Sequence, residues 1–151
     1  IIENSKKKDY SKKINVCTKT FQALRIFVNK ETTELIEGII KATKHVKSGG
    51  KIIVISFHSI EDKIVKYFFS NYSKNKSKPS RYLPEEDDLN STFFENYRNN
   101  FLKPSLEELD QNSSSRSAKL RYAIRNSKDF FIPEKFKDKF KKYLYLEAIS
   151  E

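Results

Sequence analysis

Six polar residues that could bind or transform a ligand stand close together in the middle of the chain. They are Ser56, His58, Ser59, Glu61, Asp62 and Lys63. They follow a short apolar run and precede a segment with helical spacing, so we expect them between the carboxyl end of a strand and the start of a helix. Ligands of open α/β sheets bind at that place, and the free N–H groups of a helix N-terminus favour phosphates and other polar ligands. Two interpretations of this pattern stay open. It indicates a substrate pocket, or it reflects ordinary helix capping by Ser59 with Asp62.

A second polar group is cationic and lies further along the chain. Arg116, Ser117, Lys119 and Arg121 follow one another closely, and such side chains are usual contacts to nucleic-acid phosphates. Apolar and polar residues alternate through 116–125, which predicts a β-strand. Two interpretations stay open, namely contacts to an RNA backbone or the solvated side of an edge strand whose charges prevent aggregation.

Two helices are predicted upstream of the first polar group. Apolar residues recur at spacings of three and four from residue 20 and again from residue 35. The two stripes are Phe21, Leu24, Phe27 and Val28, then Leu35, Ile39, Ala42 and Val46. We expect Thr32 or Thr33 to cap the second helix, and Ser48-Gly49-Gly50 to end it.

The run Ile52-Ile53-Val54-Ile55 predicts a strand that is buried on both faces, as in a parallel sheet covered by helices. A helix with an apolar face follows it, formed by Ile60, Ile64, Val65, Phe68 and Phe69. Together these elements predict an α/β fold of the doubly wound kind.

The remaining segments are less patterned. We expect a long surface loop or insertion over 70–103, which is acidic at 85–88, and a short capped helix at 104–108. An amphipathic helix is predicted after Pro133, with Phe136, Phe140, Tyr143, Leu144 and Ala148 on one stripe.

Composition excludes several classes of protein. The chain has 151 residues and a net charge of +10, and no apolar run approaches the length of a membrane span. Cys17 has no partner for a disulfide, and two histidines with one cysteine cannot form a typical structural zinc site, so we expect no metal. The Gly-rich loop of nucleotide-binding folds is also missing, so the cofactor-binding segment of an enzyme would lie outside this chain.

The chain starts at Ile1 and contains no methionine, so we expect a fragment or a processed product. Residues 1–19 are rich in lysine. This composition is consistent either with a solvated terminus or with an arm that attracts phosphates.

Three segments together resemble one enzyme family. They are K-T-F-Q-A-L-R-I-F-V-N at 19–29, G-G-K-I-I-V-I-S-F-H-S-I-E-D-K-I-V-K at 49–66, and the segment 112–121, which ends in R-S-A-K-L-R. They are similar to bacterial small-subunit ribosomal RNA cytosine-N4 methyltransferases of the RsmH (MraW) type. Lys63 stands where the family usually has Arg, and Asn112-Ser113-Ser114 replaces a typical Asn-Pro-Arg.

The resemblance implies a partial Rossmann-like fold of the class I methyltransferases that use S-adenosylmethionine, with the chain forming its C-terminal strands and helices and the end of a helical insertion. It implies methylation of N4 of a cytosine in small-subunit ribosomal RNA. The cofactor would be bound mainly by an N-terminal half that has no counterpart here, so no cofactor-binding residue is assigned in this chain. Which residue acts as the general base stays open.

We expect Ser56, His58, Ser59, Glu61, Asp62 and Lys63 to line the substrate pocket. Arg25, Arg116, Ser117, Lys119 and Arg121 are expected to contact RNA. The partners would be small-subunit ribosomal RNA or a ribosomal subunit and a second copy of the chain in a homodimer, with no membrane. The location would be the cytoplasm for a bacterial source and a plastid or mitochondrion for a eukaryotic one.

The expected organisation has five parts. These are a basic segment (1–19), a helix-helix-strand-helix part of the core (20–69), the loop (70–103), a core strand region (104–125) and a helical tail (126–151). A non-catalytic RNA- or ribosome-binding module that kept the methyltransferase fold is the alternative to the enzyme.

Overall fold

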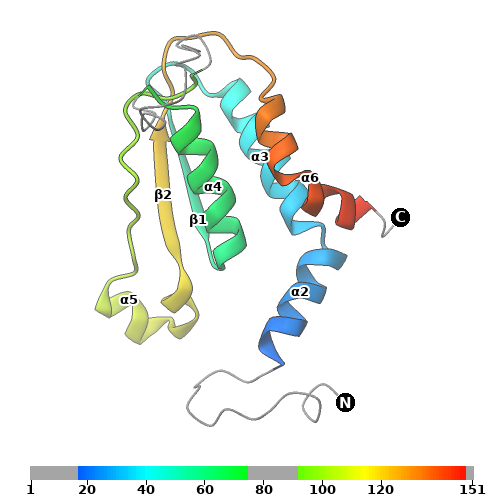
Figure 1. The fold of residues 1–151 in the computed structure, drawn as a ribbon. Helices are drawn as coiled ribbons and strands as arrows, with labels where there is room; N and C mark the ends of the chain where they lie inside the picture. Colours follow the sequence, from blue (N-terminus) through cyan, green and yellow to red (C-terminus); the bar gives the residue numbers. More distant parts are fainter. Residues whose placement is uncertain (1–16, 75–91, 149–151) are drawn as a thin grey trace, which may run out of the picture.

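The computed structural model describes residues 17–74 and 92–148. Within these ranges the chain forms a mixed α/β structure with five α-helices, one short 3-10 helix and two β-strands (Figure 1). The elements in order are α2 (Thr18–Val28), α3 (Glu31–His45), β1 (Lys51–Ser56), α4 (Ser59–Asn71), α5 (Leu106–Gln111), η1 (Ser113–Ser117), β2 (Lys119–Ile124) and α6 (Glu134–Ala148). The basic residues 1–16 and the acidic stretch 85–88 lie outside the described residues.

The two strands form an antiparallel pair, in which Ile53 lies opposite Tyr122 and Ser56 opposite Lys119. Helix α4 packs against both strands and covers one face of the pair. Ile52 is buried on that face, whereas Ile53 and Ile55 are 58% and 54% exposed on the other. The prediction of a strand buried on both faces is therefore wrong for the described part of the chain, because a β-branched run satisfies strand geometry whether or not its second face is covered.

The face of β2 that carries Arg121 is turned toward the interior of the structure. Arg121 and Ala123 are buried, while Tyr122 on the opposite face is half-exposed. The alternation at 116–125 correctly predicted a strand, but it did not reveal which face is covered. The orientation depends on a buried partner for Arg121, which is described below.

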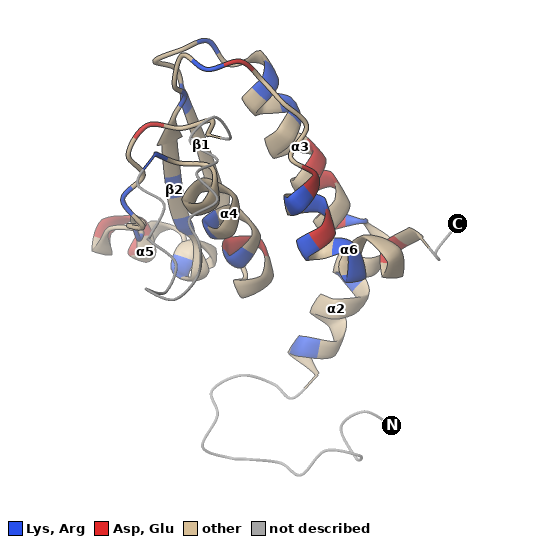
Figure 2. Cartoon of the chain, turned by 45° about the horizontal axis from the view of Figure 1, so that its top comes forward, with Lys and Arg blue, Asp and Glu red and all other residues tan. Residues whose placement is uncertain are grey.

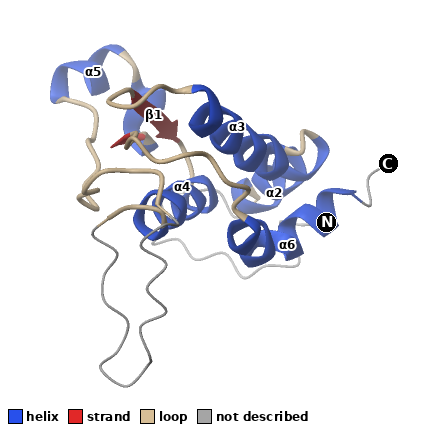
Figure 3. Ribbon diagram, turned by 90° about the horizontal axis from the view of Figure 1, so that it is seen from above, coloured by secondary structure: helices blue, strands red, loops and turns tan. Residues whose placement is uncertain are grey.

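Aromatic side chains form most of the core between α4, α6 and the segment after residue 92. Phe68 of α4 lies next to Phe93, Phe94 and Phe136, with ring centroids 4.6–6.0 Å apart. Figure 3 shows α3, α4 and α6 gathered around this region. Phe93 and Phe94 are fully buried, so the prediction of a surface loop over 70–103 is wrong for 92–97.

Helices α2 and α3 meet at a sharp turn. Lys30 has a left-handed backbone with φ of 50°, and it directly precedes the first residue of α3. The predicted caps Thr32 and Thr33 lie inside α3 instead, and their backbone N–H groups donate to the carboxylate of Glu147 from α6, at 3.2 and 2.9 Å. A side chain distant in sequence therefore caps α3, and it also fixes α6 beside α3 (Figure 1).

Helix α2 is weakly packed in this chain. Ile26 is its buried residue, and the predicted apolar stripe is exposed, including Phe21 at 63% and Val28 at 70%. The prediction of a helix is confirmed, and its apolar stripe lies at the surface of the described residues. The helical prediction for the tail is confirmed by α6, in which Phe136 and Phe140 are buried.

Candidate functional site

The turn between β1 and α4 is shaped by a reciprocal capping box. His58 is the N-cap residue of α4, and its Nδ1 accepts a hydrogen bond from the backbone N–H of Glu61 at 3.4 Å. Glu61 Oε2 in turn accepts from the backbone N–H groups of Phe57 and His58, at 2.8 and 3.2 Å. The predicted cap of Ser59 with Asp62 is wrong by one residue, which leaves the Asp62 carboxylate available for another role.

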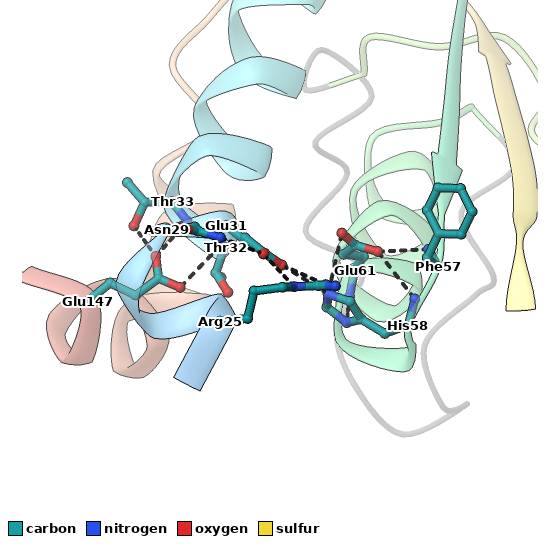
Figure 4. Close-up of polar contacts among 9 residues, drawn as sticks. All are labelled: Arg25, Asn29, Glu31, Thr32, Thr33, Phe57, His58, Glu61 and Glu147. Atoms are coloured by element: carbon teal, nitrogen blue, oxygen red, sulfur yellow. Dashed lines mark hydrogen bonds and ion pairs between the residues drawn. The ribbon is translucent and has the colours of Figure 1, made fainter. Parts of the chain in front are cut away.

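The same turn faces the start of α3 (Figure 4). The guanidinium of Arg25 donates from Nε to Glu31 Oε1 at 2.8 Å and from its terminal nitrogen to Oε2 at 3.1 Å. His58 Nε2 lies 3.3 Å from Glu61 Oε1 and 3.7 Å from Glu31 Oε2. Arg25 and His58 each come from a segment that carries the family resemblance, so the two segments meet at this cluster.

Opposing effects act on the Glu31 carboxylate. Burial raises its pKa, but hydrogen bonds from Arg25 and Asn29 and the charge of Arg25 outweigh burial, so the pKa lies below its usual value. Glu31 is therefore ionised at neutral pH. The structure brings a carboxylate to His58 that the sequence analysis did not assign to the site.

Asp62 forms the second polar centre, on the side of α4 that faces β2. Its Oδ1 accepts from Arg121 Nε at 2.7 Å, and its Oδ2 accepts from Lys119 Nζ at 3.1 Å. Burial raises the pKa of Asp62, but the hydrogen bonds from both cations outweigh it and hold the pKa below its usual value. Asp62 thus fixes α4 to β2 by an ion pair that is largely buried.

Arg121 does not lie where a contact to RNA requires it. Its side chain is 4% exposed, and its guanidinium also donates to Tyr97 Oη at 3.0 Å and Asn99 Oδ1 at 3.2 Å. The expectation that Arg121 binds an RNA backbone disagrees with this burial. In this chain Arg121 supports the fold.

The other expected RNA contacts remain at the surface. Arg116 and Ser117 are exposed in η1, and Lys119 is partly exposed beside the ring of Phe101, whose centroid is 5.0 Å from its Nζ. Arg25 is exposed as well, although Glu31 binds it. Lys and Arg are spread over several helices as well as the β2 region (Figure 2), so charge alone does not single out one surface.

The expected pocket residues separate into two groups. His58 and Glu61 face the Glu31 cluster, and Asp62 faces β2. Ser56 is buried, with its hydroxyl 3.4 Å from the carbonyl oxygen of Lys119, while Ser59 and Lys63 are exposed. The six residues therefore do not converge on one cavity among the described residues.

A cavity of about 280 Å³ lies elsewhere, between α3 and α6. It is lined by Lys30, Thr33, Ile36, Glu37, Lys137, Leu144, Glu147 and Ala148. It is not at the carboxyl end of β1, and it is small for a ligand site. Its lining of lysine, glutamate, threonine and aliphatic side chains offers neither an aromatic ring nor a Gly-rich turn for the adenosine of S-adenosylmethionine, so it does not fit that cofactor.

The structure also brings three potential metal ligands together, although the sequence analysis expected none. Glu31, His58 and Glu61 each offer one ligand atom, and these atoms all lie within 4.8 Å of one another. Glu31 was missed because it is distant from His58 in sequence and belongs to another helix. The available signal was the position of Glu31, two residues after the first family segment, which ends at Asn29.

Comparison with known proteins places this mixed α/β chain among methylases. The sequence profile described as the MraW methylase family matches residues 1–126. The chain therefore belongs to the MraW methylase family.

Curated relatives share the name "Ribosomal RNA small subunit methyltransferase H". The protein from Bartonella bacilliformis is 48% identical over 117 residues, which cover 78% of this chain and 35% of that protein. The protein from Agrobacterium fabrum is 43% identical over 127 residues, or 84% of this chain and 36% of that protein. The chain thus spans about a third of the length of the curated relatives it matches. Among the described residues, no helix is both long enough and apolar enough to cross a bilayer.

Proposed function

We propose that this chain is the C-terminal part of an S-adenosylmethionine-dependent methyltransferase that methylates N4 of a cytosine in small-subunit ribosomal RNA. The observation that carries the proposal is the family match over residues 1–126, together with relatives named as small-subunit ribosomal RNA methyltransferases. Two of the segments that carry the resemblance meet at one polar cluster in the fold, which supports a common role for them.

In this proposal the remaining part of the enzyme packs on the β1–β2 pair and completes a Rossmann-like fold. The support is an apolar face that the described residues leave open, with Ile53, Ile55 and Tyr122 about half-exposed side by side on β1 and β2. A contiguous apolar face of this kind usually marks an interface. The cofactor S-adenosylmethionine would then be bound mainly by residues outside this chain.

The chain's part in the reaction is to bind RNA and to support the substrate pocket. Arg116 and Ser117 in η1 and the exposed part of Lys119 are the proposed contacts to RNA phosphates. His58 and Glu61 hold the turn at the end of β1, where substrates of α/β enzymes bind. The proton that leaves the cytosine amino group is not assigned to any residue.

Mapping of N4-methylcytidine by mass spectrometry in small-subunit RNA tests the activity. Cells that carry the complete gene are compared with cells from which it is deleted. We expect one modified cytosine to be lost on deletion and restored by the complete gene. An unchanged methylation pattern, combined with binding of the protein to ribosomal subunits, would instead support the non-catalytic binding module.

Two binding experiments test whether the cofactor binds outside this chain and whether this chain contacts RNA. Calorimetry with the 151-residue chain alone should detect no tight S-adenosylmethionine binding, and stoichiometric binding would contradict the proposal. In the complete protein, Arg116→Glu should weaken RNA binding and lower the slope of its salt dependence by about one. Lys44→Glu, on the exposed side of α3, serves as the charge-matched control.

A further inference from the structure

The cluster at the start of α3 and α4 has the spacing of a metal site. His58 Nε2 lies 3.3 Å from Glu61 Oε1 and 3.7 Å from Glu31 Oε2. Ligand atoms that surround Zn²⁺ tetrahedrally at ~2.0–2.1 Å lie about 3.4 Å apart. The two separations from His58 bracket this value, and all three ligand atoms lie within 4.8 Å of one another, so small side-chain movements would place an ion among them.

An unsatisfied buried atom also points to a ligand here. The His58 side chain is 7% exposed, and its Nε2 is a buried atom that makes no hydrogen bond. Buried polar atoms nearly always have a partner. Nε2 is directed between two carboxylates, as Figure 4 shows, and a cation bound by all three groups would satisfy it.

Glu61 is held by one oxygen and presents the other, whereas both oxygens of Glu31 accept from Arg25. Glu61 Oε2 accepts from two backbone N–H groups, which leaves Oε1 facing His58. Glu31 Oε1 accepts from Arg25 Nε at 2.8 Å, whereas the bond from Arg25 to Oε2 is longer, at 3.1 Å. Arg25 is 56% exposed, so it can release Oε2 and still orient Glu31 through Oε1. Such outer partners are what fix the ligands of metal sites.

His58 must rearrange its hydrogen bonds for this role. An imidazole that binds a metal through Nε2 carries its proton on Nδ1, the atom that accepts from the Glu61 N–H in this structure. That capping bond is 3.4 Å long. It is at the weak end of the range. With its proton on Nδ1, the imidazole would set a second N–H group against that of Glu61, so metal binding has to open this cap and let both donors reach other acceptors.

From these observations we propose that Glu31, His58 and Glu61 bind one divalent transition-metal ion, with Zn²⁺ as the best match. One imidazole and two carboxylates suit zinc better than magnesium, which prefers oxygen ligands in an octahedron. Three protein ligands leave a position for water. The ion would join the α2–α3 turn to the start of α4.

The test is metal binding by the complete 151-residue chain after treatment with a chelator and its removal. Calorimetry with ZnCl₂ should give one ion per chain, with a Kd of about 1 µM or tighter. Co²⁺ should give the visible absorption bands of a four- or five-coordinate site. Glu31→Gln and Glu61→Gln should each weaken binding at least about tenfold. The matched control Glu37→Gln, which changes an exposed carboxylate on α3, should bind as the unmodified chain does.

Two further variants exclude other ligands. Cys17→Ser and His45→Ala should keep the affinity, because neither residue belongs to the cluster. The proposal is overturned by absence of saturable binding, by equal affinity of the Glu61→Gln variant, or by loss of binding in Cys17→Ser. Circular dichroism confirms that each variant is folded. Because methyl transfer is not measured, failure here leaves the proposed function intact.

Discussion

Replacement of Asp62 by asparagine should lower the free energy of unfolding by about 3 kcal/mol. The Asp62 side chain is 14% exposed and that of Arg121 is 4% exposed, with 2.7 Å between Oδ1 and Nε. Removal of one partner from a buried ion pair costs ~3–5 kcal/mol, because the other charge stays buried. Arg121 keeps Tyr97 Oη and Asn99 Oδ1 as acceptors, which places the expected loss at the lower end of this range.

Urea denaturation followed by far-UV circular dichroism measures this loss. Lys119→Gln is the control, since the Lys119 side chain is 36% exposed. Its contact with Asp62 should contribute under about 1 kcal/mol. A loss of about 1 kcal/mol or less for Asp62→Asn would be no larger than the loss expected when a helix cap is removed. That result would refute the assignment of Asp62 as the buried partner of Arg121.

The same ion pair should make stability depend on acid pH. The pKa of Asp62 is below its ordinary value of 3.8 in the folded chain. The carboxylate therefore contributes its full stabilisation above that ordinary value, and this contribution is lost as the pH falls through the lower, folded-state pKa. The difference in unfolding free energy between the unmodified chain and Asp62→Asn should shrink over this acid range, and a constant difference would exclude the linkage.

Three other substitutions and one control test the fold by the same urea titration. Glu147→Gln should cost about 2 kcal/mol, because the charged cap of two N–H groups at the start of α3 is lost. Asp138→Asn, at an exposed site on α6, should have no measurable effect. Phe136→Ala should cost ~3–5 kcal/mol as a cavity opens beside Phe68, and a loss below about 1 kcal/mol would show that α6 does not pack there. Gly49 has a φ of 81° and open space for a methyl group. Gly49→Ala should therefore cost about 1 kcal/mol through backbone conformation alone, and a neutral result would contradict that conformation.

The helices and strands could be predicted because their signals are local. Periodicity located α3, α4 and α6, and alternation located β2. The capping residue of α4 was missed by one position, because the imidazole of His58 accepts from the Glu61 N–H, whereas the Ser59 hydroxyl was expected to accept from the Asp62 N–H. Because Glu61 completes the capping box with His58, the Asp62 carboxylate is the one that faces β2.

The faces of the elements and the makeup of the site could not be predicted from local pattern. Arg121 is buried because Asp62 lies beside it, although the two are far apart in sequence. Glu31 reaches His58 because Lys30 turns the chain between α2 and α3. Each of these contacts depends on how the elements pack against one another. The charge and periodicity of a single element do not predict that packing.

The bond from Glu147 to the start of α3 bears on where this protein can be cut. The family match ends at residue 126, yet α6 lies wholly beyond it and contributes Phe136, Phe140 and the α3 cap. A shortened version designed from the family boundary would remove the buried rings of Phe136 and Phe140 from the core and leave two backbone N–H groups of α3 without acceptors. Truncations meant to keep this scaffold intact should therefore retain the chain through residue 148.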